Sequence, residues 1–116
     1  MAIVKMTPDK LNAMNEGVTM SAAKAMDAAD GIYIQYTGKD HNILVILKGS
    51  ASDTVTIEGG DGLQGVCDET VALDGTNSVA IALESGRFKI LSGEHKGYVH
   101  LKGKATTTVQ AVELPL

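Results

Sequence analysis

The feature that most constrains this chain is an alternation of apolar and polar residues with a period of two, which begins after Gly31. Ile32, Ile34 and Tyr36 share one face of the first such run. Because successive side chains of a strand point to opposite faces, this pattern predicts β-strands with one buried face. The run Ile43–Leu47 is apolar at every position, which predicts a central strand covered on both faces.

Further strands are expected at short intervals, separated by turns rich in Gly, Asp, Asn and Ser. They are predicted over residues 54–58, 70–73, 78–84, 87–91, 98–102 and 106–114. Short strands at this spacing are typical of two-layer and barrel folds. Residues 31–116 are therefore predicted to form an all-β domain, a β-sandwich or a jelly-roll-like barrel. A chain of 116 residues is long enough to bury one core of its own.

The first thirty residues lack this alternation and are interpreted as an N-terminal arm (1–30). Within the arm, residues 21–31 are compatible with a short helix that has Ser21 as its N-cap and Gly31 as its C-terminal stop. An irregular loop is the equal alternative, because so short a helix is marginal in isolation.

All five methionines lie in the arm, at positions 1, 6, 14, 20 and 26. Methionine is flexible and polarizable, so one interpretation is an adaptable segment that packs on a partner. The alternative is that one is the initiator and the others cover the open end of the core. The candidate partner-binding residues are four of these methionines and two cations: Met6, Met14, Met20, Met26, Arg87 and Lys89.

Charge is unevenly distributed along the chain. Residues 49–86 contain seven acids and no lysine or arginine, whereas residues 87–104 contain five cations and one acid. Such a division suits complementary surfaces of neighbouring subunits, although solvated loops are the commoner explanation. The net charge of −4 and the scarcity of aromatic residues disfavour nucleic-acid binding.

Few motifs point to chemistry. Residues 60–65 match GxGxxG, but that fingerprint requires a following helix and a strand is predicted here instead. Glu58, Asp61, Asp68 and Glu69 could cage a calcium ion, although their spacing is not that of an EF-hand, and exposed turn acids are the simpler interpretation. The lone Cys67 is interpreted as a structural thiol.

The three histidines, at positions 41, 95 and 100, are too scattered for a metal motif, and His100 is assigned to a polar strand face. No nucleophile elbow or P-loop occurs. We therefore predict no enzymatic activity, no cofactor and no bound metal. No apolar run is long enough to span a bilayer and no secretory signal is present, so the chain is expected to be made in the cytosol.

The region from about residue 42 to 116 resembles small proteins encoded in the structural modules of tailed phages and prophages. The segments that carry the resemblance are 43–47 (ILVIL) followed by Gly49-Ser50, 54–57 (TVTI), 60–65 (GDGLQG), 83–89 (LESGRFK), 93–97 (GEHKG) and 112–115 (VELP). These are core strands and turns, and they cover roughly two thirds of the chain.

This resemblance implies a capsid decoration, or head cement, protein on the virion exterior. Its partner would be the major capsid protein, and the chain would form a homo-oligomer, with a trimer favoured. Alternatives are a head-tail joining, tail or fibre-associated virion module, or a small glycan- or calcium-binding β module.

Overall fold

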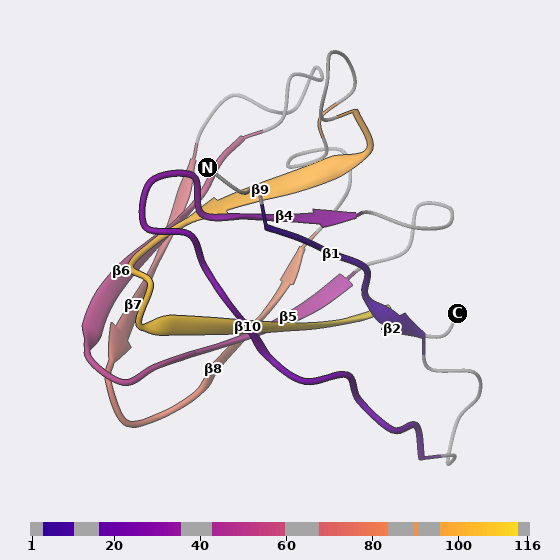
Figure 1. The fold of residues 1–116 in the computed structure, drawn as a ribbon, viewed down its shortest axis with the longest axis horizontal. Helices are drawn as coiled ribbons and strands as arrows, with labels where there is room; N and C mark the ends of the chain where they lie inside the picture. The colour runs from indigo at the N-terminus through magenta and orange to yellow at the C-terminus, as the bar shows by residue number, and fades with distance from the viewer. Residues whose placement is uncertain are drawn as a thin grey trace.

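The computed structural model describes residues 4–10, 17–35, 43–59, 68–83, 90 and 96–113, and every regular element among them is a β-strand (Figure 1). The strands form two packed sheets, which confirms the all-β prediction and is consistent with a β-sandwich. Sheet A has the order β1-β4-β9-β6-β7, with bounds Lys5–Met6, Ile32–Gln35, Tyr98–Lys102, Ser52–Ile57 and Glu69–Asp74. Sheet B has the order β2-β10-β5-β8, with bounds Asp9–Lys10, Thr107–Glu113, Ile43–Gly49 and Val79–Leu83, and β3 (Lys24–Ala25) also pairs with β10.

The core lies between the two sheets, where alternate side chains of each strand meet. Most of its members are fully covered: Ile32, Ile34, Ile43, Val45, Leu47, Val55, Ile57, Leu83, Val99, Leu101 and Val109. Each large aliphatic side chain removed from water contributes about 1.5–3 kcal/mol to folding, so this layer is the main source of stability. Leu44 and Ile46, on the other face of β5, are only half-buried, so the expected cover on both faces of this strand is incomplete.

The predicted strands agree well with the observed ones. The prediction for 98–102 has the observed bounds, and those for 54–58, 70–73, 78–84 and 106–114 are correct to within two residues at each end. Of the predicted strand 87–91, only Ile90 is described, and its backbone N–H donates to the carbonyl of Tyr98 at 2.9 Å. Tyr36 lies outside the described residues.

The helix considered for residues 21–31 is wrong. Ser21 does not cap a helix; its backbone N–H and hydroxyl both donate to the Asp9 carboxylate, at 2.8 and 2.7 Å. Lys24 and Ala25 instead pair with β10, and a turn follows in which Asp27 accepts hydrogen bonds from the backbone. The exposed edge of β10 offers this segment backbone partners, and these outweigh a helix that would be too short to be stable alone in spite of its alanines.

Gly31 ends that turn at a position that only glycine can occupy. Its φ is +69°, and a Cβ there would lie 1.9 Å from the carbonyl oxygen of Leu101. The strands β4 and β9 pair from Ile32 with Leu101 onward, so the missing side chain lets them come together at their first residue pair.

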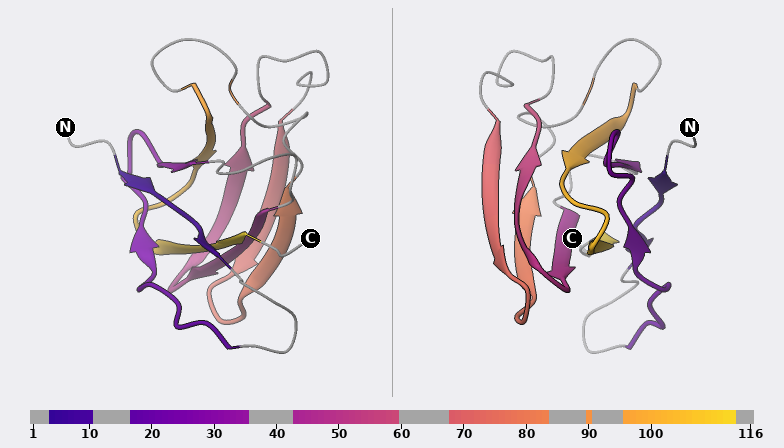
Figure 2. Two further views of the ribbon diagram at one scale, coloured as in Figure 1. Left: turned by 90° about the vertical axis from the view of Figure 1, so that its right-hand side faces the viewer. Right: turned by 60° about the vertical axis from the view of Figure 1, so that its left-hand side comes forward.

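The N-terminal segment pairs with strands of both sheets along one side of the sandwich. β1 pairs in parallel with β4 in sheet A, while β2 and β3 both pair with β10 in sheet B. The predicted boundary at residue 30 therefore separates segments that are hydrogen-bonded to each other. On the opposite side of the molecule lie β7 and β8, which the right-hand view of Figure 2 shows far from the N-terminal segment.

Candidate functional site

A row of polar side chains crosses the outer face of sheet A. Strand register places Lys5 of β1 beside Tyr33 of β4, and Tyr33 beside His100 of β9. The rings of Tyr33 and His100 are stacked, with centroids 4.1 Å apart and planes 1° apart. Glu58, directly after β6, contacts the other side of His100. The row therefore joins four chain segments that are remote in sequence.

The Glu58–His100 pair is the arrangement closest to a catalytic dyad in the described part of the chain. The carboxylate of Glu58 contacts Nδ1 of His100, while Nε2 lies 2.6 Å from the backbone carbonyl of Asp30. A general base needs a ring nitrogen directed at the proton it removes. Both nitrogens of His100 are engaged within the fold and its side chain is only 11% exposed, so the pair fastens β9 to its neighbours.

The exposed end of the row is aromatic and cationic. Tyr33 and Tyr98 meet edge to face, with centroids 6.5 Å apart. The Lys5 ammonium lies 5.2 Å from the centre of the Tyr98 ring, within the range of a cation–π contact. These contacts hold the short strand β1 on the edge of sheet A.

Asp53 joins the two sheets where the chain passes from β9 to β10. Its carboxylate accepts hydrogen bonds from the Thr107 hydroxyl at 2.6 Å and from the Lys104 backbone N–H at 2.9 Å. Burial by itself raises the pKa of Asp53, but these hydrogen bonds to the ionised form outweigh it and leave the pKa below its ordinary value of 3.8. Asp53 is therefore a charged clamp at the corner of the sandwich.

Two further aspartates hold backbone groups in the same way, Asp74 within its own turn and Asp9 across to residue 21. The Asp74 carboxylate accepts hydrogen bonds from the backbone N–H groups of Asn77 and Thr76, both at 2.8 Å, and these lower its pKa. The pKa of Asp9 is lowered by the backbone N–H and the hydroxyl of Ser21. Both carboxylates shape the backbone.

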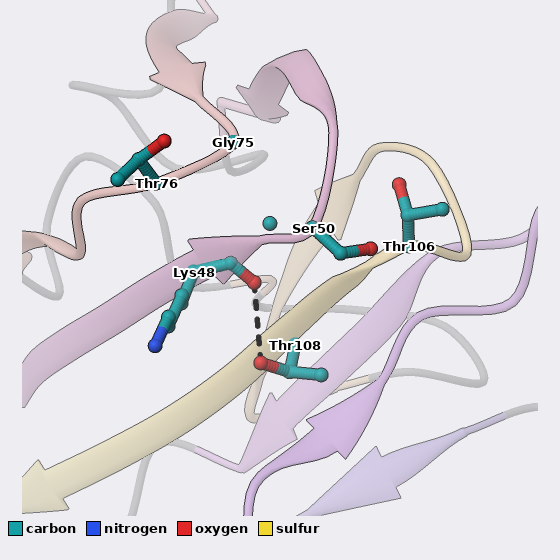
Figure 3. Close-up of a pocket in the computed structure, with 7 residues that line it drawn as sticks. Lys48, Ser50, Gly75, Thr76, Thr106 and Thr108 are labelled. Atoms are coloured by element: carbon teal, nitrogen blue, oxygen red, sulfur yellow. Dashed lines mark hydrogen bonds between the residues drawn. The ribbon is translucent and has the colours of Figure 1, made fainter.

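An open depression of about 550 Å³ lies at one end of the sandwich, where the turns after β5, β7 and β9 meet (Figure 3). It is lined by Lys48, Gly49, Ser50, Gly75, Thr76, Thr106 and Thr108. The Thr108 hydroxyl is already committed to the carbonyl of Lys48, at 3.2 Å. Another open depression, beside Asp53 and Lys104, is similarly shallow. Neither has the enclosed, apolar lining typical of a small-molecule site.

The acids considered for calcium are used separately where they are described. Glu58 contacts His100, and the Asp68 carboxylate accepts a hydrogen bond from the backbone N–H of Gly59 at 2.8 Å. Among the described residues there is no group of three or more potential metal ligands. Asp61 and Cys67, together with the glycine-rich loop 60–65 and two of the histidines, lie outside the described residues.

The six predicted partner-binding residues are placed differently. Met6 and Met26 belong to the core, with 8% and 3% exposure, and therefore offer little surface to a partner. Met20 is the large hydrophobic side chain that stays exposed in the described part of the chain, at 37%. Met14, Arg87 and Lys89 lie outside the described residues.

The alternation of apolar and polar residues does not indicate which strands lie at the edges of the sheets. β7 and β8 are each paired on one side only among the described strands, and we call this pair of strands the open edge. Val71, Val79 and Ile81 point toward the core there but remain half-buried. β8 carries no charge and no proline, the features that usually protect an edge strand from pairing with another chain.

Comparison with known proteins finds no match. No protein-family model matches the sequence, no curated protein matches it, and no solved structure matches the fold. No helix among the described residues is long and apolar enough to cross a membrane.

Proposed function

We propose that this chain is a non-enzymatic structural protein that binds the outer surface of a tailed-phage capsid, through the major capsid protein, and stabilises it. The sequence resemblance over residues 42–116 suggests this class. The observation that carries the proposal is the use of the polar side chains: His100, Asp53 and Asp74 all bind groups of their own fold. The part of the chain that the structure describes therefore offers broad faces and a strand edge, which suit contact with proteins.

Stabilisation would follow from preferential binding. A protein that binds an expanded shell more tightly than its precursor adds its binding free energy to the expanded state. Repetition over many equivalent positions multiplies a modest interface. A rigid sandwich suits this role because it loses little conformational entropy on binding.

Co-sedimentation tests the proposal directly. The purified chain is mixed with expanded capsids that lack accessory proteins and, as the matched control, with unexpanded shells of the same phage. We expect the chain to pellet with the expanded capsids and to raise their melting temperature, with little binding to the precursor. Equal binding to both shells, or to neither, would refute the proposal. Rings of six or twelve subunits that bind only isolated connectors or tails would instead identify a joining or tail module.

A further inference from the structure

The N-terminal segment that follows the first gap in the structure is unusually exposed. In residues 17–25, which we call the arm segment, every residue except the half-buried Val18 is exposed. One edge of the arm segment is held by the pairing of β3 with β10. Its other edge has no partner among the described strands. It presents Met20, the small residues Ser21, Ala22 and Ala23, and Lys24.

The open edge has complementary properties. The half-buried Val71, Val79 and Ile81 form an apolar seam whose inward-pointing side chains are incompletely covered. The outward side chains of β8 are alanines, so another backbone can approach closely. Asp68 precedes β7 and Asp74 is its last residue, and no lysine or arginine occurs between residues 49 and 86.

We infer that the arm segment of one copy docks along the open edge of a second copy, so that the chain associates head to tail. Strand pairing with β8 would satisfy the outer backbone groups of the arm segment, and Met20 would cover the apolar seam. Lys24 and the neighbouring Lys5 would face the acids at the ends of β7. The two surfaces are different and lie on opposite sides of the sandwich (Figure 2), so the contact is head to tail, and such contacts close into rings when the rotation permits.

Charge favours this arrangement over pairing of two open edges. A twofold β8–β8 contact would bring β7 of both copies to the same interface, and with them Asp68 and Asp74 of each. Like charges brought close together oppose association, whereas the arm segment supplies one cation, Lys24, and Lys5 lies beside it. This contact would specify how the homo-oligomer expected of a decoration protein forms, and in that sense it rests on the proposed function. The experiment that tests the contact needs no capsid.

Two variants block the two surfaces separately. Val79→Lys places an inward-pointing charge on the open edge, and Ala80→Lys, at an exposed position, replaces it where Val79→Lys fails to fold. Met20→Glu combined with Lys24→Glu alters only exposed side chains of the arm segment. Lys96→Glu, at an exposed lysine outside both surfaces, is the matched control.

Solution mass is measured by native mass spectrometry and light scattering. We expect an oligomer for the unmodified chain and for the control, and monomers for each blocked variant alone. An equimolar mixture of the two blocked variants should give a one-to-one dimer, because each supplies the surface that the other lacks. A monomeric unmodified chain, or no dimer in the mixture, would overturn the inference. An arm variant that keeps the native mass would also overturn it, and would indicate twofold pairing of open edges.

The capsid experiment is independent of this one. Oligomers that do not bind expanded capsids would refute the proposed function and leave the head-to-tail contact standing. A monomeric chain that binds expanded capsids would refute the head-to-tail contact and leave the proposed function standing.

Discussion

The two sides of the sandwich are built in opposite ways. On the N-terminal side, β1, β2 and β3 cover the edges of both sheets, and Met6 and Met26 close the core behind them. On the other side, β7 and β8 have no further strand among the described residues, and three core-facing aliphatic side chains are left half-buried. One side is completed by the chain itself, whereas the other has the properties of a surface to be completed by another molecule.

This difference shows that an extension which looks irregular in sequence can be part of the scaffold. Three strands of two residues each protect the edges of β4 and β10, while the longer and more regular β8 is left unprotected. Regular strands build the core, whereas the short irregular ones cover sheet edges that would otherwise be open. Each of the following experiments separates the contributions of the two sides.

The largest effect is expected at Gly31, where the N-terminal side joins β4. Gly31→Ala puts a methyl group against the Leu101 carbonyl at a positive φ, and we expect a loss of about 3–5 kcal/mol or failure to fold. Urea denaturation measures it. The matched control is Gly97→Ala, which has a similar φ of +89° but open space around it, and should cost only about 1–2 kcal/mol. Equal costs at the two glycines would contradict the role of close packing at Gly31.

Truncating one aliphatic side chain on each side compares their packing. Met26→Ala removes a buried side chain from the closed side and should cost about 2–4 kcal/mol. Ile81→Ala, at the half-buried open edge, should cost about 1 kcal/mol in dilute monomer, because part of that side chain already contacts water. Stability is measured by urea denaturation at low protein concentration. A larger loss of stability for Ile81→Ala than for Met26→Ala would show that the Ile81 side chain is more fully covered than the structure indicates.

Acid should weaken the fold through carboxylates on both sides. The pKa values of Asp9, Asp53 and Asp74 are all lower in the folded chain than the ordinary value of 3.8. The ionised forms therefore stabilise the fold above about pH 4, and this stability is lost as the pH falls through the lowered values. Thr107→Val removes one of the hydrogen bonds that lower the pKa of Asp53 and should raise that pKa. Carboxyl titration by NMR measures it, and Asp9 and Asp74 serve as internal controls whose pKa values should not move.

The smallest effect is expected on the outer face of sheet A. Lys102→Gln removes an ammonium 3.7 Å from the Glu58 carboxylate, but the lysine is 52% exposed and water screens the pair. Stability should change by less than about 0.5 kcal/mol. Thermal melts measure the stability of both variants. His100→Ala, which removes the stacked ring and both of its polar contacts, should lower stability more than Lys102→Gln does. Comparable losses would mean that the row depends on its surface charge and not on the ring.

The strands could be predicted from sequence because alternation reports local geometry. The apolar run that begins at Ile43 gave a central strand, and Tyr98–Lys102 was predicted with its observed bounds. The polar row could not be predicted, because alternation shows that Tyr33 and His100 point outward but not that they are neighbours across two strands. The helix that was one of two alternatives near Ser21 is wrong for the same reason, since Lys24 and Ala25 pair with a strand more than eighty positions away. Register and edge position depend on the whole topology, which no local pattern contains.

The pairing of β10 has a consequence for how the protein is made. Val112 pairs with Asp9 and with Leu44, and Val109 with Lys24, so one late strand binds three earlier segments. During synthesis, β2, β3 and one edge of β5 lack their partner until β10 has been made, so sheet B stays incomplete until then. Folding that depends on such distant contacts is slow, because much chain entropy is lost before they form. The unfinished polypeptide is therefore the stage at which chaperones would matter most.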